Sequence, residues 1–111
     1  MEKKLLTFLI DDDADDQEIF LMAMKRAYPF AECVFANDGI YALEKFRTDS
    51  SFLPHIIFID INMPRMNGIQ CLLEIKKLSR LRHIPAYMYS TSAERSIVEE
   101  CLQIGKLRRF F

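Results

Sequence analysis

Consecutive acidic residues near the start of the sequence are the first feature that could carry chemistry. Asp11, Asp12 and Asp13 follow directly on the apolar residues 5–10. Adjacent like charges repel and raise one another's pKa, so such a cluster is costly unless a cation lies nearby. Mg²⁺ would relieve the repulsion, because it prefers carboxylate and water oxygens. The run predicts either a metal site or, more simply, one aspartate that caps a helix beside solvated acids.

A second acidic residue, Asp60, follows another apolar run, at residues 55–59. An acid that ends a buried strand lies at the mouth of the sheet between apolar walls. A carboxylate there can act as a nucleophile toward a phosphoryl group or as a metal ligand. Pro64 and Gly68 would shape the loop before the next helix. Taken alone, Asp60 also fits an ordinary loop residue.

A hydroxyl side chain, Ser90, follows the fourth apolar run, at residues 86–89. A hydroxyl at a strand end could donate a hydrogen bond to a phosphoryl oxygen. The alternative is a polar strand end followed by a helix cap, which is common because serine bonds readily to nearby backbone.

The elements that must position these side chains follow from the hydrophobic pattern. Five short apolar runs alternate with four amphipathic segments, and the runs are residues 5–10, 32–36, 55–59, 86–89 and 108–111. The segments expected to be helices begin after Asp13, at Asp38, at Gly68 and near Glu94. Asp38 can cap the second helix at its start, and Gly105 can cap the last helix at its end. This alternation predicts a parallel sheet with helices on both faces and ligands at the carboxyl ends of its strands.

Apolar residues at helical spacing predict which face of each helix packs on the sheet. The expected stripes are Ile19, Phe20, Ala23, Met24 and Ala27 in the first helix, Ile40, Leu43 and Phe46 in the second, Ile69, Leu72 and Leu73 in the third, and Ile97, Val98, Cys101 and Leu102 in the fourth.

Composition limits the classes of protein that remain. The chain has 111 residues, which suits one domain, and 50% of them are hydrophobic against 28% charged. A net charge of -1 gives no reason to expect direct nucleic-acid binding. The apolar runs are too short to span a bilayer, and acidic residues stand where a signal peptide would be cleaved, so we expect a cytoplasmic protein without membrane contact.

The cysteines are odd in number and widely spaced, at Cys33, Cys71 and Cys101. This pattern favours buried thiols.

Together these features resemble the receiver domain of two-component response regulators. Asp11 and Asp12 resemble the acidic pair that positions Mg²⁺, and Asp60 resembles the phosphorylated aspartate. The backbone carbonyl of Asn62 would be a further metal ligand, and Ser90 matches the switch hydroxyl. Two further stretches match family signatures, namely Met63-Pro64 followed by Gly68, and Asn37-Asp38-Gly39.

The resemblance implies a fold for the whole chain, taken as one receiver domain over residues 1–111 that is incomplete at its C-terminus. The fold is a flavodoxin-like (CheY-like), doubly wound, five-stranded parallel sheet of order 2-1-3-4-5. Helices would cover both faces, with the fifth helix absent. The family's conserved lysine would fall just beyond Phe111, and its aromatic switch position falls near Arg109, with Phe110 the nearest aromatic residue.

The function that the resemblance implies is phosphoryl acceptance rather than enzymatic turnover. A histidine kinase, a phosphotransfer protein or a small phosphodonor would phosphorylate Asp60 in a Mg²⁺-dependent reaction, and a separate effector protein would read the result. Only self-dephosphorylation is expected, and the bare sheet face left by a missing helix makes a homodimer an option.

Two alternatives remain open. One is a pseudo-receiver that binds protein without phosphorylation. The other is a Mg²⁺-dependent phosphohydrolase. Such enzymes have an acid at the position where this chain has Asn62, which argues against this alternative.

Overall fold

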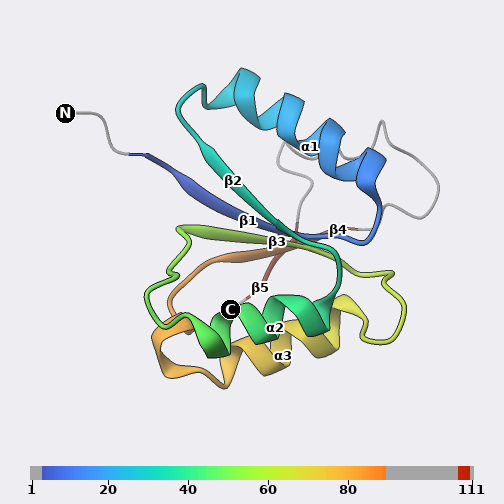
Figure 1. Cartoon of the computed structure of the whole chain (residues 1–111), viewed down its shortest axis with the longest axis vertical. Helices are drawn as coiled ribbons and strands as arrows, with labels where there is room; N and C mark the ends of the chain where they lie inside the picture. The colour runs from blue at the N-terminus through green and yellow to red at the C-terminus, as the bar shows by residue number, and fades with distance from the viewer. Residues whose placement is uncertain (1–3, 90–107, 111) are drawn as a thin grey trace.

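The computed structural model describes residues 4–89 and 108–110 (Figure 1). Strands and helices alternate as expected as far as the fourth strand. The elements are β1 (Leu6–Ile10), α1 (Ala14–Ala27), β2 (Glu32–Ala36), α2 (Gly39–Thr48), β3 (Ile56–Asp60), α3 (Gly68–Lys76), the 3-10 turn η1 (Ser79–Leu81), β4 (Ala86–Tyr89) and β5 (Arg108–Phe110). The expected fourth helix lies outside the described residues, as does Ser90.

The strands form one sheet in the order β2-β1-β3-β4-β5, which confirms the predicted flavodoxin-like order. β1 pairs in parallel with β2 and β3, and β3 pairs in parallel with β4. β5 runs antiparallel to β4, with Arg108 opposite Met88, so the expectation of a fully parallel sheet is wrong for this strand. An apolar run indicates a strand but does not set its direction, and an antiparallel edge strand on a parallel sheet is common.

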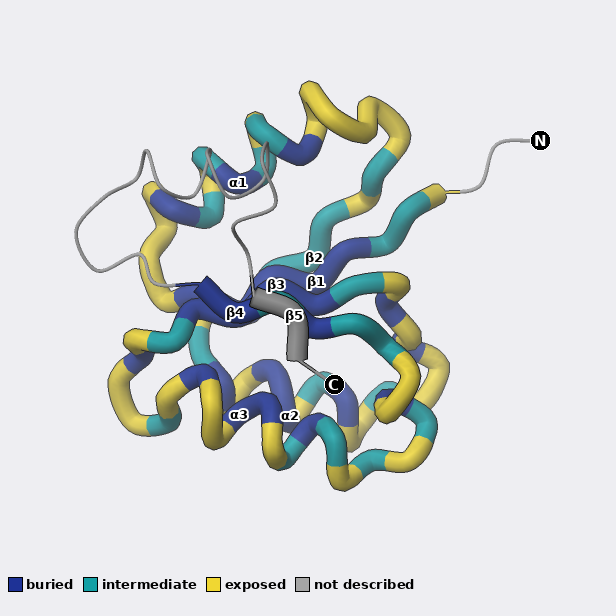
Figure 2. Tube along the Cα trace, turned by 180° about the vertical axis from the view of Figure 1, so that it is seen from behind, coloured by how far each residue is buried: buried dark blue, intermediate teal, exposed yellow. Residues whose placement is uncertain are grey.

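Helices cover both faces of the sheet, as predicted. α1 lies on one face, and α2 and α3 lie side by side on the other (Figures 1 and 2). Successive residues of a strand point to opposite faces, so Phe8 and Ile10 join the core under α2 and α3 while Leu9 joins the core under α1. All three are fully buried, which explains why this strand is apolar without alternation.

The predicted helix faces are only partly correct. Phe20 and Met24 of α1, Leu43 and Phe46 of α2 and Leu72 of α3 are buried as expected. Ile40, Ile69 and Leu73 are instead exposed, at 47%, 54% and 61%. The buried face of α3 consists of Gly68, Cys71, Leu72 and Ile75. In a helix of only nine residues several neighbouring stripes are apolar, and the packing against β3 and α2 decides which one is buried.

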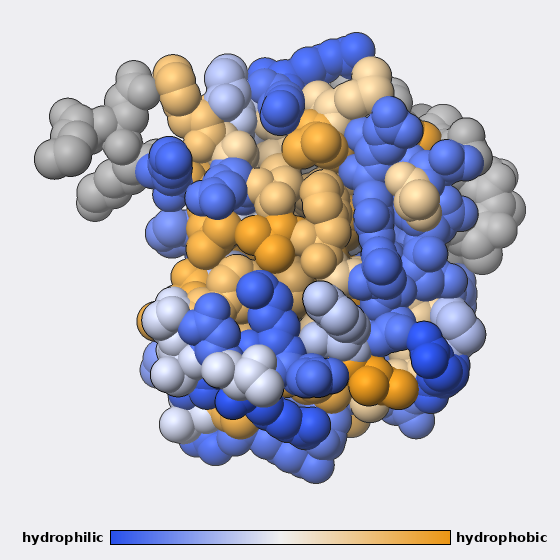
Figure 3. Space-filling model, in the orientation of Figure 1, coloured by the Kyte–Doolittle hydropathy of each residue, from blue (hydrophilic) through white to orange (hydrophobic). Residues whose placement is uncertain are grey.

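One edge of the sheet carries apolar surface. β2 is an edge strand, and Cys33, Val34 and Phe35 within it are only half-buried. Figure 3 shows apolar atoms gathered there, between α1 and the layer of α2 and α3. In the part of the chain that the structure describes, no helix is long and apolar enough to cross a membrane.

Candidate functional site

Three carboxylates meet at the carboxyl end of the sheet, and we call Asp11, Asp12 and Asp60 the acidic triad. β1 and β3 are parallel neighbours, with Ile10 paired to Ile59, so the residues that end them share one edge. One carboxylate oxygen from each member of the triad lies within 4.8 Å of the others. Asp11 and Asp60 are buried, at 0% and 1% exposure, whereas Asp12 is exposed. The predicted grouping of these three residues in space is therefore observed.

Asp13 has a different role from its two neighbours. Its Oδ1 accepts hydrogen bonds from the backbone N–H groups of Asp15, at 2.8 Å, and Asp16, at 3.3 Å. Asp13 is thereby the N-cap of α1, and it satisfies donors that the first turn of a helix otherwise leaves unpaired. The capping role predicted for one aspartate of the run is therefore confirmed for Asp13, whereas Asp11 is buried rather than solvated.

The Asp11 carboxylate is held at both oxygens. Oδ1 accepts the backbone N–H of Asp13 at 2.9 Å, and Oδ2 accepts the hydroxyl of Tyr89 at 2.8 Å. The backbone N–H of Asp11 donates to the carbonyl oxygen of Ala36 at 3.0 Å, which continues the pairing of β1 with β2. The orientation of this side chain is therefore fixed from two directions.

Burial raises the pKa of Asp11 from 3.8 to about 7. The hydrogen bonds from Asp13 and Tyr89 lower this pKa, but the negative charges of Asp60 and Asp16 raise it further. Negative charge on the Asp11 carboxylate is therefore unfavourable near neutral pH without a cation. An all-oxygen set of two buried carboxylates and one exposed carboxylate suits Mg²⁺, which keeps several waters and takes few protein ligands.

The loop after Asp60 is pinned to the sheet by its backbone. The N–H of Asn62 donates to Asp60 Oδ1 at 3.0 Å, which fixes the rotation of that carboxyl group. The N–H of Ile61 donates to the carbonyl of Tyr89 at 2.8 Å, and the N–H of Gly68 donates to the carbonyl of Ile61 at 3.0 Å. These bonds hold Asn62 beside the triad.

The start of α3 approaches β3 so closely that only glycine fits at position 68. A Cβ at Gly68 would lie 2.5 Å from the carbonyl oxygen of Asp60. The helix is also capped, since Asn67 Oδ1 accepts the N–H of Gln70 while Gln70 Oε1 accepts the N–H of Asn67. The close approach of α3 to the end of β3 therefore explains on steric grounds why the Met-Pro-x-x-x-Gly signature ends in glycine.

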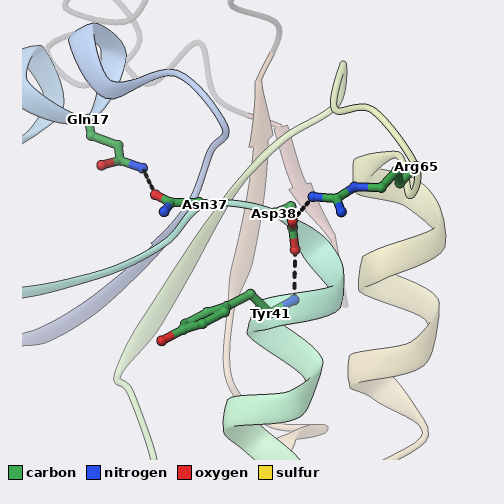
Figure 4. Close-up of polar contacts among 5 residues, drawn as sticks. All are labelled: Gln17, Asn37, Asp38, Tyr41 and Arg65. Atoms are coloured by element: carbon green, nitrogen blue, oxygen red, sulfur yellow. Dashed lines mark hydrogen bonds and ion pairs between the residues drawn. The ribbon is translucent and has the colours of Figure 1, made fainter.

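Polar side chains connect the loops around the site (Figure 4). Gln17 Nε2 donates to the backbone carbonyl of Asp11 at 2.8 Å and to Asn37 Oδ1 at 3.0 Å. The first contact holds the residue that leaves β1, and the second holds the loop after β2. Gln17 was not among the predicted site residues, because its contacts depend on how α1 lies over the sheet.

A second connection joins the loops after β2 and β3. Asp38 Oδ1 accepts the backbone N–H of Tyr41 at 2.7 Å, which confirms the predicted cap of α2. Asp38 Oδ2 forms an ion pair with Arg65, whose φ of 66° is in the left-handed region (Figure 4). The loop that follows β3 is thus anchored to the start of α2.

Tyr89 is the main site residue that the sequence analysis missed. It ends an apolar run and was counted only as strand. The signal that could have found it is its place at the carboxyl end of β4, the same edge of the sheet where Asp60 ends β3. Buried tyrosine hydroxyls usually have a hydrogen-bond partner, and an acid lies within reach at that edge.

Comparison with known proteins agrees with this architecture. The sequence pattern of the response regulator receiver domain matches residues 7–108. Protein-glutamate methylesterase/protein-glutamine glutaminase 1 of Albidiferax ferrireducens is 35% identical over 108 residues, which is 95% of this chain but 27% of that protein. Response regulator mcs4 of Schizosaccharomyces pombe is 37% identical over 76 residues, 68% of this chain and 14% of that protein.

Solved structures show the same fold. The phosphorylated cyanobacterial phytochrome response regulator RcpA has a TM-score of 0.73 at 26% identity, over 92% of this chain and 77% of that one. The Mn²⁺-bound form of response regulator Rcp1 has a TM-score of 0.69 at 25% identity, over 89% of this chain and 76% of that one. This chain belongs to the family of response regulator receiver domains.

Proposed function

We propose that this receiver domain accepts a phosphoryl group on Asp60 in a Mg²⁺-dependent reaction. The observation that carries the proposal is the acidic triad, which brings Asp60 together with Asp11 and Asp12 at the carboxyl end of the sheet. Asp11, Asp12, Asp60 and the backbone carbonyl of Asn62 would hold the ion. The phosphorylated form of RcpA and the Mn²⁺-bound form of Rcp1, two similar structures, support this chemistry.

The proposed reaction uses Asp60 as the nucleophile. One of its carboxylate oxygens forms a bond to phosphorus while the bond from phosphorus to the donor breaks, and the donor leaves with the electron pair of that bond. The N–H of Asn62 keeps the carboxyl group in one rotation and so orients the attack. When bound, Mg²⁺ supplies positive charge that offsets the charge on the phosphoryl oxygens.

The proposed donor is a histidine kinase or a phosphotransfer protein, with acetyl phosphate as a small-molecule substitute. Phosphorylation adds about −1.5 to −2 charge units, and we propose that the hydroxyl of Ser90 responds to that charge. The signal then passes to a separate effector protein in the cytoplasm rather than to nucleic acid. The domain itself would catalyse only the loss of its own phosphoryl group. This chain spans 27–28% of the first methylesterase relatives, and their named activities are not assigned to it.

The test is phosphorylation by acetyl phosphate, followed by intact-mass spectrometry. The wild-type domain and Asp60→Asn are compared with a matched control, Asp15→Asn, which changes an exposed aspartate outside the triad. We expect one added phosphoryl group in the wild type and the control, and none in Asp60→Asn or in the presence of a chelator. Labelling that persists in Asp60→Asn would overturn the assignment of the acceptor. A wild type that no donor labels would favour the pseudo-receiver.

A further inference from the structure

We propose that Tyr89 is a positioning residue for the metal ion, because its hydroxyl fixes the Asp11 carboxylate in the orientation in which the acidic triad holds Mg²⁺. This inference rests on the Mg²⁺ site of the proposed function. It assigns a role to a tyrosine that neither ligates the ion nor accepts the phosphoryl group.

The path of the Tyr89 side chain across the sheet is the first observation. Tyr89 ends β4, which pairs with β3 and not with β1. Its hydroxyl nevertheless bonds to Asp11, the residue that follows β1, at 2.8 Å. The side chain therefore passes beyond β3 to reach the neighbouring strand end. It does so on the α1 side of the sheet, where it packs in the core cluster with Phe20 and Phe58.

The burial of this contact is the second observation. Tyr89 is 5% exposed and Asp11 is fully buried, so bulk water competes little for either group. A hydrogen bond to a charged acceptor in such surroundings is among the stronger kinds. The ring is also confined by its neighbours in the core, so the hydroxyl has little freedom to leave the carboxylate.

The division of hydrogen bonds between the two oxygens of Asp11 is the third observation. Asp13 N–H holds Oδ1 and the Tyr89 hydroxyl holds Oδ2, which together fix the rotation of the carboxylate. Each carboxylate oxygen has two lone pairs, so either oxygen can still bind a metal ion. Without the hydroxyl one anchor is lost, and Asp11 can rotate about the remaining one. Partners of ligating groups typically contribute about 10–100-fold to metal affinity.

The backbone of Tyr89 ties the same residue to the acceptor strand. Its carbonyl accepts the N–H of Ile61, the residue after Asp60, at 2.8 Å. Tyr89 is also paired with Asp60 in the register of β3 and β4. One residue therefore contacts the metal ligand that follows β1 through its side chain and the acceptor loop that follows β3 through its backbone. That arrangement sets the relative position of two members of the triad.

The test compares Tyr89→Phe with Tyr87→Phe by isothermal titration with Mg²⁺. Tyr87 is a matched control because it lies on the same strand, is half-buried and stacks on Phe58 with ring centroids 5.7 Å apart. Among the described residues its hydroxyl has no hydrogen-bond partner. Each variant removes one oxygen and keeps the ring. We expect Tyr89→Phe to bind Mg²⁺ about 10–100-fold more weakly, with Tyr87→Phe unchanged.

Two outcomes contradict the account in different ways. A folded Tyr89→Phe that binds Mg²⁺ as tightly as the wild type overturns the positioning role and leaves the metal site intact, since the hydroxyl would then serve stability alone. A wild type that does not bind Mg²⁺ overturns the metal site of the proposed function itself.

A second measurement uses only the wild-type protein, so it does not depend on whether a variant folds. In wild-type protein labelled at the tyrosine ring carbon that bears the hydroxyl, the NMR signal of Tyr89 should shift in step with Mg²⁺ saturation, and that of Tyr87 should not. A Tyr89 signal that stays in place as Mg²⁺ saturates the protein contradicts the proposal.

Discussion

Replacing Gly68 with alanine should force α3 away from the end of β3. The new Cβ would lie 2.5 Å from the carbonyl oxygen of Asp60, 2.9 Å from Cα of Ile61 and 3.0 Å from Cγ2 of Ile59. The first two are backbone atoms, and they cannot rotate out of the way. The clash therefore falls on the strand end that carries the proposed acceptor.

The size of the effect follows from these distances. Ordinary contacts of a Cβ begin at 3.4 Å, so the start of α3 must retreat by roughly 0.9 Å. Overpacking of this kind costs about 1–3 kcal/mol, partly offset by the better helix propensity of alanine, worth up to about 1 kcal/mol. A net loss of about 1–2 kcal/mol corresponds to a fall in Tm of roughly 5–10 °C for a domain of this size.

Thermal unfolding followed by circular dichroism measures this loss, with Gly39→Ala as the matched control. Gly39 is likewise the first residue of its helix, but a Cβ there meets Met66 Sδ at 3.0 Å, the mobile part of a flexible side chain, and Cys71 Cβ at 3.2 Å. We expect Gly39→Ala to unfold near the wild-type temperature. If Gly68→Ala is as stable as the wild type, or if both variants lose the same stability, the steric reasoning is wrong.

Two further predictions concern Asp11 and Arg65. Burial raises the pKa of Asp11 from 3.8 to about 7, so the folded protein keeps a proton that the unfolded chain releases. The metal-free domain should therefore lose stability as the pH rises from about 4 to about 8. Asp11→Asn should remove most of that loss of stability, so the variant should have a higher Tm than the wild type at about pH 8 with a chelator present. If the Tm of the two proteins depends on pH in the same way, this prediction is wrong. Arg65 has a φ of 66°, a backbone conformation that costs alanine free energy but suits glycine. Both Arg65→Gly and Arg65→Ala lose the ion pair with Asp38, so their comparison isolates the backbone. We expect Arg65→Gly to be more stable than Arg65→Ala by about 1–2 kcal/mol in urea unfolding. Equal stability of these two variants would show that the backbone there carries no such cost.

The parts of the structure that could be predicted depend on local pattern. A nearly continuous apolar run such as residues 5–10 indicates a strand buried on both faces, and an acid at its end must then lie at the carboxyl edge of the sheet. Because parallel strands end at the same edge, Asp11 and Asp60 could be placed together without knowledge of any contact. The cap at Asp38 was predictable for a similar reason, since it depends only on the residues that follow it.

The parts that could not be predicted depend on packing in three dimensions. Ile69 and Leu73 have the composition of a core face, yet the pairing of α3 with α2 leaves both exposed. The direction of β5 is not encoded in an apolar run. Tyr89 reads as one more apolar strand residue, and its hydroxyl gains a role only because β4 and β1 end on either side of β3.

The central claim is that Asp60 receives the phosphoryl group, and site mapping tests it most directly. The wild-type domain would be phosphorylated by acetyl phosphate with Mg²⁺ and then treated with borohydride, which reduces an aspartyl phosphate to homoserine. Peptide mass spectrometry would then locate the modified residue. The account predicts homoserine at position 60 alone, and none when Mg²⁺ is chelated. Homoserine at Asp11 or Asp12, or the same yield at position 60 without Mg²⁺, would contradict it.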